Sequence, residues 1–294
     1  MTTPYEAARE ALSGAIAIRK RIRVSLDEPL AIIDAALQLD IHVSIAALSS
    51  VEGIWCKEKR AIVLTSLRPA GRRAFTCAHE IAHCHFGHGS RFDELQESAV
   101  ASSDSPEESL ADQTAAHLLM PLFAVAAAIK LRNWDVKRLT PVQAYILASF
   151  FGVSYRGFLS HLHHNLGLIG YAGYSNIVKI APKDIRTALF NGAQTRNIVF
   201  VDEFWKDRPV DAEVGDVILL PHDVTGSGEL LQTMPSQNAY GVVAVARAPG
   251  INILENLPHS RSLLLRVTVA QFEGFGMYRF PEQNNVYSGT TRRN

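Results

Sequence analysis

The sequence is poor in cysteine and has no surplus of charge of either sign. Among its 294 residues there are 3 cysteines, and 29 Lys and Arg residues balance 29 Asp and Glu residues. A secreted domain held by disulfides carries more cysteines, in even number. A protein that mainly coats nucleic acid or anionic lipid needs an excess of Lys and Arg. These shortages exclude both classes for the chain as a whole.

Long apolar runs are also missing. No stretch approaches the roughly 18 uninterrupted apolar residues of a membrane-spanning helix, and the richest one, residues 118–129, is much shorter. The first residues are polar and mixed in charge, unlike a secretory signal. With 47% hydrophobic and 20% charged residues, the composition is that of a folded globular protein. We therefore expect a cytoplasmic protein without a membrane-bound segment.

The apolar periodicity predicts an α+β protein. Helical spacing, together with a break at Pro121, predicts helices at residues 4–21, 27–39, 71–86 and 108–131, and two or three short ones between 140 and 166. Alternating or short apolar runs predict strands at residues 41–45, 61–64, 197–201, 217–220, 240–245 and 263–267. Glu52-Gly53 has the composition of a turn between the first two strands. Residues 91–109, rich in Ser, Asp and Glu, are expected to form a mobile loop.

The pattern changes from helical to strand-like near residue 169, which predicts a domain boundary. We expect a catalytic domain at residues 1–130, a helix-turn-helix-like helical segment at 131–169, a β-rich domain at 170–285 and a tail at 286–294. The β-rich domain carries no motif that we can assign. A dimerisation domain and a plain scaffold both remain open for it.

The strongest indication of a catalytic site is His79-Glu80-Ile81-Ala82-His83, an H-E-x-x-H pattern within a predicted helix. Residues four apart project from one face of a helix, so both imidazoles can bind one metal ion while Glu80 lies beside it. A hydrolytic zinc site uses three protein ligands and leaves a fourth position for water. The metal acidifies that water, and the adjacent glutamate takes its proton and delivers it to the leaving amine. The pattern predicts a zinc peptidase with His79 and His83 as ligands and Glu80 as base.

An extended version of the motif, H-E-x-x-H-x-x-G-x-x-H, is not present. It would need glycine at position 86 and histidine at position 89, where the sequence has Phe86 and Gly89. His85 and His88 come close to that spacing, and we interpret them as helix-end or surface residues.

A third ligand is available further along the chain. Glu108 and Asp112 stand one helical turn apart in a second predicted helix. Glu108 can reach the metal, and Asp112 can hold a ligand imidazole through its other nitrogen, which fixes the tautomer and raises the basicity of the ligand. The alternative is that both are acidic residues favoured at a helix N-terminus.

These motifs together resemble the ImmA/IrrE-type metallopeptidase family. The resemblance is carried by the run Arg73-Ala74-Phe75-Thr76-Cys77-Ala78-His79-Glu80-Ile81-Ala82-His83, by Glu108 and Asp112, and by Ala115-Ala116-His117-Leu118-Leu119-Met120-Pro121. It covers about residues 27 to 130 closely, with departures from the family pattern at Leu110 and Thr114.

The resemblance implies a gluzincin-like peptidase with a restricted substrate. Family members cleave helix-turn-helix transcriptional repressors and so derepress stress-response or mobile-element genes. They often carry an additional sensor-like domain, so the resemblance adds a sensor to the roles open for residues 170–285. Carried over by position, His79, His83 and Glu108 would be ligands of Zn²⁺, or of Mn²⁺ in the cell, with Glu80 as base and Asp112 supporting a ligand. A DNA-binding or ligand-responsive regulator that uses the peptidase fold as a scaffold is the alternative.

Residues 148–154 have the composition of the turn in a helix-turn-helix, with Gly152 at the turn and Ser154 as the cap of the next helix. Gly157 weakens that helix, which also offers few Arg, Asn or Gln side chains for base edges. We therefore favour packing against the peptidase or substrate docking over DNA binding. Three histidines of this segment are interpreted as surface or core-edge residues and not metal ligands: His161, His163 and His164.

Overall fold

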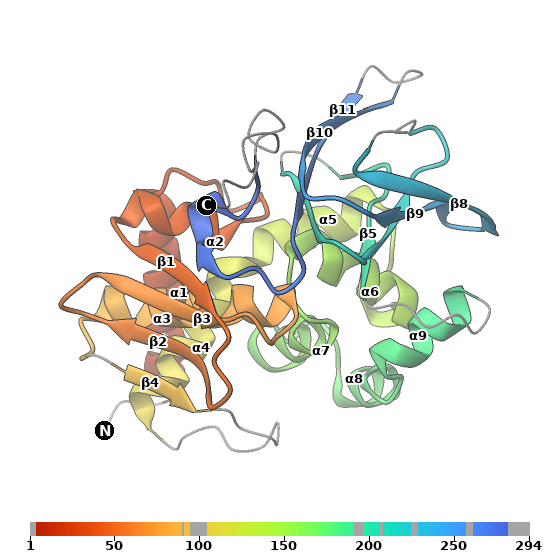
Figure 1. Cartoon of the computed structure of the whole chain (residues 1–294). Coiled ribbons are helices and arrows are strands. Elements are labelled where there is room, and N and C mark those ends of the chain that lie inside the picture. The colour runs from red at the N-terminus through yellow and green to blue at the C-terminus, as the bar shows by residue number, and fades with distance from the viewer. Residues whose placement is uncertain are drawn as a thin grey trace, which may run out of the picture. The chain divides into compact units, whose positions relative to one another are not determined.

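A five-stranded sheet and the helices stacked on it build the first part of the chain (Figure 1). The computed structural model describes residues 4–89, 91–94, 105–190, 197–205, 208–224, 229–256 and 261–281. They fall into two compact units. The first holds the chain up to Ile185 together with Glu273–Gly276, and the second holds Arg186–Phe272 and the residues from Met277 onward. The mixture of helices and sheets confirms the expected α+β class.

The sheet of the first unit has the strand order β12-β1-β3-β2-β4. Its strands are β1 (His42–Ala46), β2 (Val51–Cys56), β3 (Ala61–Thr65), β4 (Arg91–Glu94) and β12 (Gly274–Phe275). β1 runs parallel to β3, whereas β2 is antiparallel to both of its neighbours, and β12 is antiparallel to β1. Ile62 and Leu64 of the central strand are fully buried, as expected for alternate positions that face the core.

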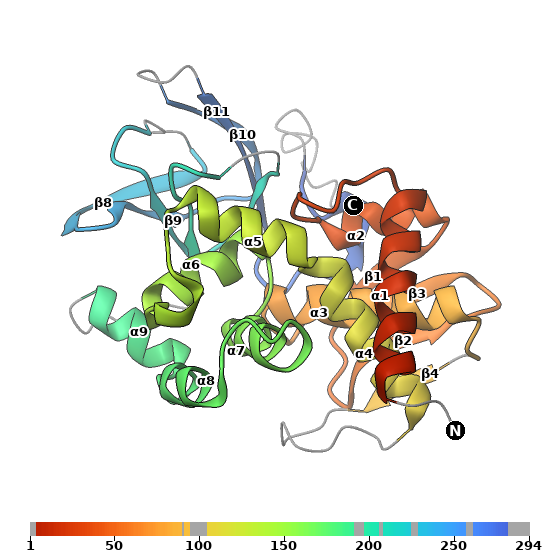
Figure 2. The same cartoon turned by 180° about the vertical axis from the view of Figure 1, so that it is seen from behind.

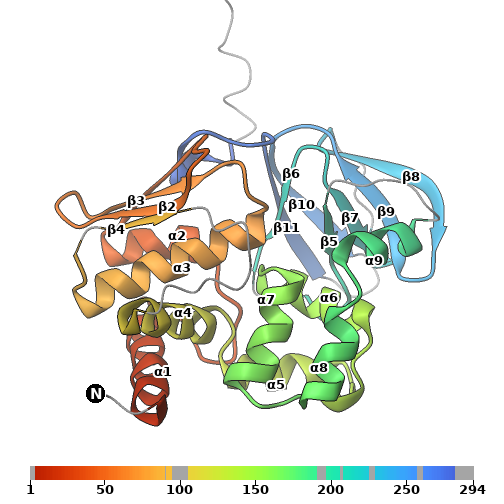
Figure 3. The same ribbon diagram turned by 90° about the horizontal axis from the view of Figure 1, so that it is seen from below.

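Helix α3 lies between this sheet and a second layer of helices, as Figure 3 shows from below. The helices of this region are α1 (Pro4–Arg21), α2 (Ile32–Ala36), α3 (Ala70–Phe86), α4 (Pro106–Leu119) and α5 (Leu122–Leu131), with a 3-10 turn at Leu37–Leu39. α3 packs on β2 and β3 on one side and on α4 on the other, and α1 packs on α4. The helix with the H-E-x-x-H pattern therefore lies between the sheet and the helix that carries Glu108.

By length and composition, Pro106–Leu131 is the one described helical stretch that could cross a membrane. Pro121 divides it into α4 and α5, as the sequence predicts. Of the 18-residue apolar segment in this stretch, 67% is buried inside the structure, which is typical of a core helix. The buried Arg19 of α1 donates from Nε to the carbonyl of Leu118 at 2.8 Å and from Nη1 to that of Glu28 at 3.0 Å. It supplies a cationic donor at the C-terminal end of α4.

A helical segment follows, best seen in Figure 2. It consists of a 3-10 turn at Val136–Arg138, α6 (Pro141–Phe151), α7 (Tyr155–Ser160), a π-helical turn at His161–Asn165, α8 (Tyr171–Val178) and α9 (Pro182–Leu189). Gly152 ends α6 with φ of 66°, and the Ser154 hydroxyl accepts a hydrogen bond from the N–H of Gly157 at 3.0 Å. The predicted turn and cap are therefore present between α6 and α7.

The second unit is built from two sheets. One has the order β5-β7-β9-β8 and the other the order β10-β11-β6. Their strands are β5 (Ile198–Phe200), β6 (Val210–Glu213), β7 (Val217–Leu220), β8 (Leu231–Asn238), β9 (Gly241–Ala246), β10 (Gly250–Asn256) and β11 (Arg261–Thr268). The four residues of β7 are all buried, which explains their uninterrupted apolar sequence. A final 3-10 turn spans Gly276–Tyr278.

Several local expectations were wrong. Glu52-Gly53 lies inside β2, and the turn before β3 is formed by residues 57–60. The helix expected at residues 27–39 shrinks to α2 and one 3-10 turn. Residues 91–94 form β4 instead of loop, while residues 95–104 lie outside the described part. Helices α8 and α9 extend the helical part past the expected boundary near residue 169.

Candidate metal centre

Helix α3 presents both histidines of the H-E-x-x-H pattern to α4. The helix starts after Pro69 and runs without a break to Phe86. Residues four apart on it share a face, and here that face is covered by α4, so that His79 is 6% exposed and His83 is fully buried. The imidazoles are therefore removed from bulk water before any ligand binds.

Helix α4 supplies two carboxylates to the same place. Pro106 occupies its first turn, and Glu108 and Asp112 follow on one face. Glu108 is largely buried, with 17% of its side chain exposed, whereas the Asp112 side chain is about half exposed, at 48%. Of these acids, Glu108 is thus turned toward α3, and Asp112 reaches the same helix from a half-exposed position.

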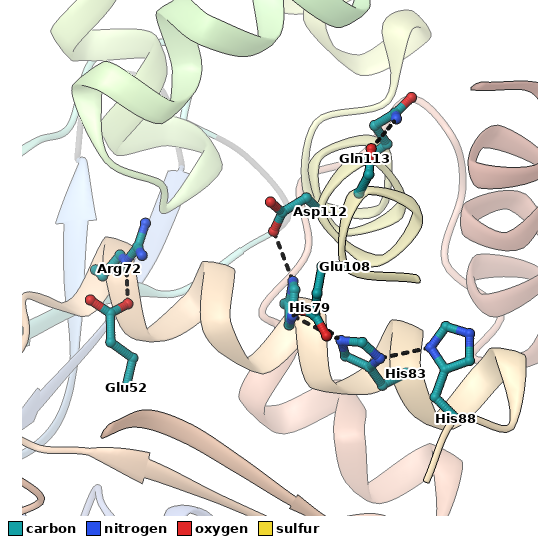
Figure 4. A network of polar contacts seen from close by, with 9 residues as sticks. Glu52, Arg72, His79, His83, His88, Glu108, Asp112 and Gln113 are labelled. Carbon is teal, nitrogen blue, oxygen red and sulfur yellow. Dashed lines mark hydrogen bonds and ion pairs between the residues drawn. The ribbon is translucent and has the colours of Figure 1, made fainter. Parts of the chain in front are cut away.

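Three potential ligand atoms converge between the two helices, as Figure 4 shows. Nε2 of His79 and Nε2 of His83 are 2.9 Å apart, and Oε2 of Glu108 lies 3.1 Å from the first and 3.3 Å from the second. Among the residues that the structure describes, these three form the group of side chains that could hold a metal ion.

The donor set fits a divalent metal such as zinc. Bonds of about 2.0–2.1 Å at tetrahedral angles separate two ligand atoms by about 3.3 Å, close to the separations observed here. Two imidazole nitrogens and one carboxylate oxygen also leave a fourth position open, as in hydrolytic zinc sites. Asp112 Oδ1 lies 2.8 Å from Nδ1 of His79, so the carboxylate accepts the Nδ1 proton and leaves Nε2 as the free donor atom.

The electrostatic environment keeps His83 neutral. Burial, and next the neighbouring His79, lower the pKa of His83 to about 4, although Glu108 opposes the shift. A neutral imidazole is the form that binds a metal. The site is therefore prepared for a cation at neutral pH without first losing a proton from this ring.

Glu80 points from α3 in a different direction, toward the sheet. It is fully buried, and its Oε1 would lie 2.8 Å from a Cβ added to Gly53 of β2. The methyl group of Thr76 would lie 2.4 Å from the same Cβ. Only glycine at position 53 leaves room for both side chains, so the backbone of β2 comes close to the Glu80 carboxylate.

An ion-pair cluster fastens this part of β2 to the start of α3. The largely buried Glu52 accepts from Nε of Arg72 at 2.5 Å (Figure 4). It also lies 3.4 Å from Nε of Arg68. β2 also has an irregular register with β4 between Val51 and Gly53. Such bulges re-aim side chains next to functional sites. Here the irregularity and the ion pairs together set the position of Gly53 against Glu80.

His88 contacts the site, and the sequence analysis missed this. It lies at the end of α3, as expected, and its Nδ1 is 2.7 Å from Nδ1 of His83 (Figure 4). The signal that could have found it is Gly87, because a glycine just past a helix brings the next residue back toward the last turn.

The group of potential metal ligands in the described residues does not include His117 of α4 or His161 and His163 of the helical segment. His161 is buried, contrary to the expected surface or core-edge position, and donates from Nε2 to the Met120 carbonyl at 2.8 Å while Asn165 donates to its Nδ1 at 2.9 Å. The ring of His117 is 5.1 Å from that of His161. His163 donates to the carbonyl of Ile169 at 2.9 Å. These contacts support packing roles for the three residues.

Comparison with known proteins places residues 38–162 in a family. They match the model of peptidase family M78, described as the IrrE N-terminal-like domain. No curated protein sequence matches the chain significantly. Among solved structures, a Mycobacterium tuberculosis transcriptional regulator aligns with 13% identity and a TM-score of 0.36, over 52% of this chain and 46% of that one. The chain thus spans less than half of the length of that structure.

Proposed function

We propose, from the membership of residues 38–162 in the IrrE N-terminal-like peptidase family, that this chain is a metal-dependent, site-specific endopeptidase. The observation that carries the proposal is the convergence of His79 Nε2, His83 Nε2 and Glu108 Oε2 within 2.9–3.3 Å of one another. Two imidazoles and a carboxylate at one point are the donor set of gluzincin-type peptidases. Zn²⁺ is the metal we propose, with Mn²⁺ as the alternative in the cell.

Each residue of the site has a separate task in this proposal. A bound divalent ion supplies Lewis acidity, which activates water and polarises the peptide carbonyl. His79, His83 and Glu108 hold that ion, and Asp112 keeps His79 in the tautomer whose Nε2 is free. Glu80 is the general base: its carboxylate accepts the proton of the attacking water and later donates it to the amine nitrogen of the leaving peptide.

The buried position of Glu80 suits a proton carrier. Glu80 is fully buried against β2, so bulk water does not surround its carboxylate. Its carboxylate lies next to Gly53 of β2, whereas the candidate ligands His79 and His83 face Glu108 of α4. Glu80 therefore stays on the side of α3 where it can exchange a proton without competing for the metal.

The proposed substrate is a helix-turn-helix transcriptional repressor, whose cleavage would derepress stress-response or mobile-element genes. This part rests on the family resemblance alone. We place the activity in the cytoplasm, where thiols stay reduced, and Cys56, Cys77 and Cys84 form no disulfide. The α6–α7 region, with half of the α7 residues buried, is proposed as a packing or substrate-docking element rather than a DNA reader.

The test uses the metal-loaded chain and a helix-turn-helix repressor encoded by a neighbouring gene. We expect one cut, detected by mass spectrometry, with the wild-type protein and no cut with Glu80→Gln at equal metal content. Equal loss of the repressor with both proteins would contradict the enzyme. A gel shift of DNA at physiological salt, without cleavage, would favour the regulator, and digestion of casein would indicate a broad-specificity peptidase.

A further inference from the structure

The end of helix α3 is a hydrogen-bonded motif that folds the chain back on itself. Gly87 has φ of 74°, a left-handed conformation that favours glycine. Its N–H donates to the Cys84 carbonyl at 3.2 Å, and the N–H of His88 donates to the His83 carbonyl at 3.0 Å. This is the Schellman pattern, in which the second residue past the helix returns to the residue five positions before it.

That return places His88 against a candidate metal ligand. In Schellman motifs the two residues so paired frequently make an apolar contact. In this protein both are histidines, with Nδ1 atoms 2.7 Å apart and ring centroids 4.9 Å apart. The ring of His88 also stacks on that of Phe86, with centroids 5.8 Å apart and 26° between the planes. Backbone and aromatic contacts thus fix the ring of His88 beside His83.

The direction of the hydrogen bond follows from the other end of the His83 ring. Its Nε2 faces Nε2 of His79 and Oε2 of Glu108, so this nitrogen must keep its lone pair for a metal. A neutral imidazole then carries its proton on Nδ1. The Nδ1–H of His83 therefore donates to Nδ1 of His88, whose own proton is on Nε2.

We propose that His88 is a positioning residue of the metal centre, which fixes the orientation and tautomer of His83 as Asp112 does for His79. This inference rests on the proposed function, because it requires that His83 binds a metal. It assigns each ligand imidazole its own acceptor at Nδ1: a carboxylate from α4 for His79, and an imidazole from the end of α3 for His83. The second acceptor depends only on the end of α3, not on the packing of α3 against α4.

The test measures metal binding by the full-length protein, without any substrate. The apo protein is titrated with Zn²⁺ against a chromophoric chelator, and with Co²⁺ to record the visible absorption of the site. We expect His88→Phe, which keeps a ring for Phe86 and removes the acceptor, to weaken Zn²⁺ binding by about 10- to 100-fold and to change the Co²⁺ spectrum. His88→Asn, which offers an oxygen near the position of Nδ1, is expected to restore most of the affinity.

Two further variants make the result specific. His85→Phe alters a neighbouring ring, which contacts Phe86 with centroids 5.0 Å apart, and is expected to leave Zn²⁺ binding unchanged. Gly87→Ala keeps the His88 side chain but strains the turn that positions it, and is expected to weaken binding as well. Zn²⁺ affinity of His88→Phe equal to that of the wild type would overturn the inference alone. Absence of metal binding by the wild type would overturn both the inference and the proposed metallopeptidase.

Discussion

Asp112 Oδ1 lies 2.8 Å from Nδ1 of His79, while Glu108, one turn earlier on the same helix, lies 3.1 Å from Nε2 of that ring. One helix therefore contacts both nitrogens of one imidazole. The carboxylate of Asp112 keeps the proton of His79 on Nδ1. The carboxylate of Glu108 lies next to Nε2, the nitrogen that carries no proton. The arrangement explains why these two acids are one helical turn apart.

Substitution of Asp112 by alanine is expected to weaken Zn²⁺ binding by about 10- to 100-fold, because His79 loses the acceptor that sets its tautomer. Isothermal titration of the apo protein measures the change. Gln113→Ala is the matched control, since Gln113 is adjacent on α4 and bonds Ser109 instead, at 3.2 Å. Equal affinities of the Asp112 and Gln113 variants would show that Asp112 has no such role.

Glu80→Gln is expected to reduce the cleavage rate by about 100- to 10,000-fold, the usual contribution of a general base. Zn²⁺ content should stay that of the wild type, because Glu80 faces Gly53 of β2 and not α4. Metal analysis and a cleavage time course on the same preparation give both values. A large loss of zinc in this variant would mean that Glu80 is a ligand.

Gly53→Ala should destabilise the protein by about 1–3 kcal/mol, a typical cost of overpacking. The new Cβ would lie 2.4 Å from the Thr76 methyl and 2.8 Å from Oε1 of Glu80, so cleavage should fall as the base is displaced. Urea unfolding and the cleavage assay report the two effects. Gly89→Ala serves as the control because its added Cβ meets nothing within 4 Å; a similar loss in both variants would argue against the close approach.

Arg19→Met is expected to lower the free energy of unfolding by about 2–3 kcal/mol, since charged hydrogen bonds to the Leu118 and Glu28 carbonyls are lost in a buried place. Burial also lowers the pKa of Arg19 to about 10, which leaves it cationic at neutral pH. Denaturant unfolding measures the loss. Lys20→Met, at an exposed position of the same helix, should change stability little, and an equally small effect at Arg19 would refute the prediction.

Acid should destabilise the helical segment through His161. Burial, and next the nearby His117, lower the pKa of His161 to about 3 in the folded protein. The unfolded chain has an ordinary histidine pKa of about 6.5 and binds the proton first, so stability is lost as the pH falls below that value. Between pH 7 and pH 5 the loss from this residue is about 2 kcal/mol. Urea unfolding of the apo protein at both pH values, compared with His161→Gln, checks it. An equal pH dependence in the variant would exclude His161 as the source.

The sequence was sufficient to predict features that depend on a single helix or strand. The spacing of His79 and His83 places both on one face of any helix, and the break at Pro121 follows from its missing N–H. It was insufficient for β2: Glu52-Gly53 has the composition of a turn, yet it lies within a strand. The ion pairs of Glu52 with Arg68 and Arg72 and the space that Gly53 leaves for Glu80 explain that position, and both depend on α3.

The sequence by itself determined the chemical groups of the site: two imidazoles on one helical face, a glutamate beside them, and two acids one turn apart on another helix. Only the tertiary structure decided which groups meet. Asp112 contacts Nδ1 of His79 rather than of His83, and at Nδ1 of His83 the contact comes from His88. The pairing depends on how α4 packs on α3 and how the chain turns at Gly87. Periodicity within a single helix specifies a face, but it contains no information about the neighbour that covers it.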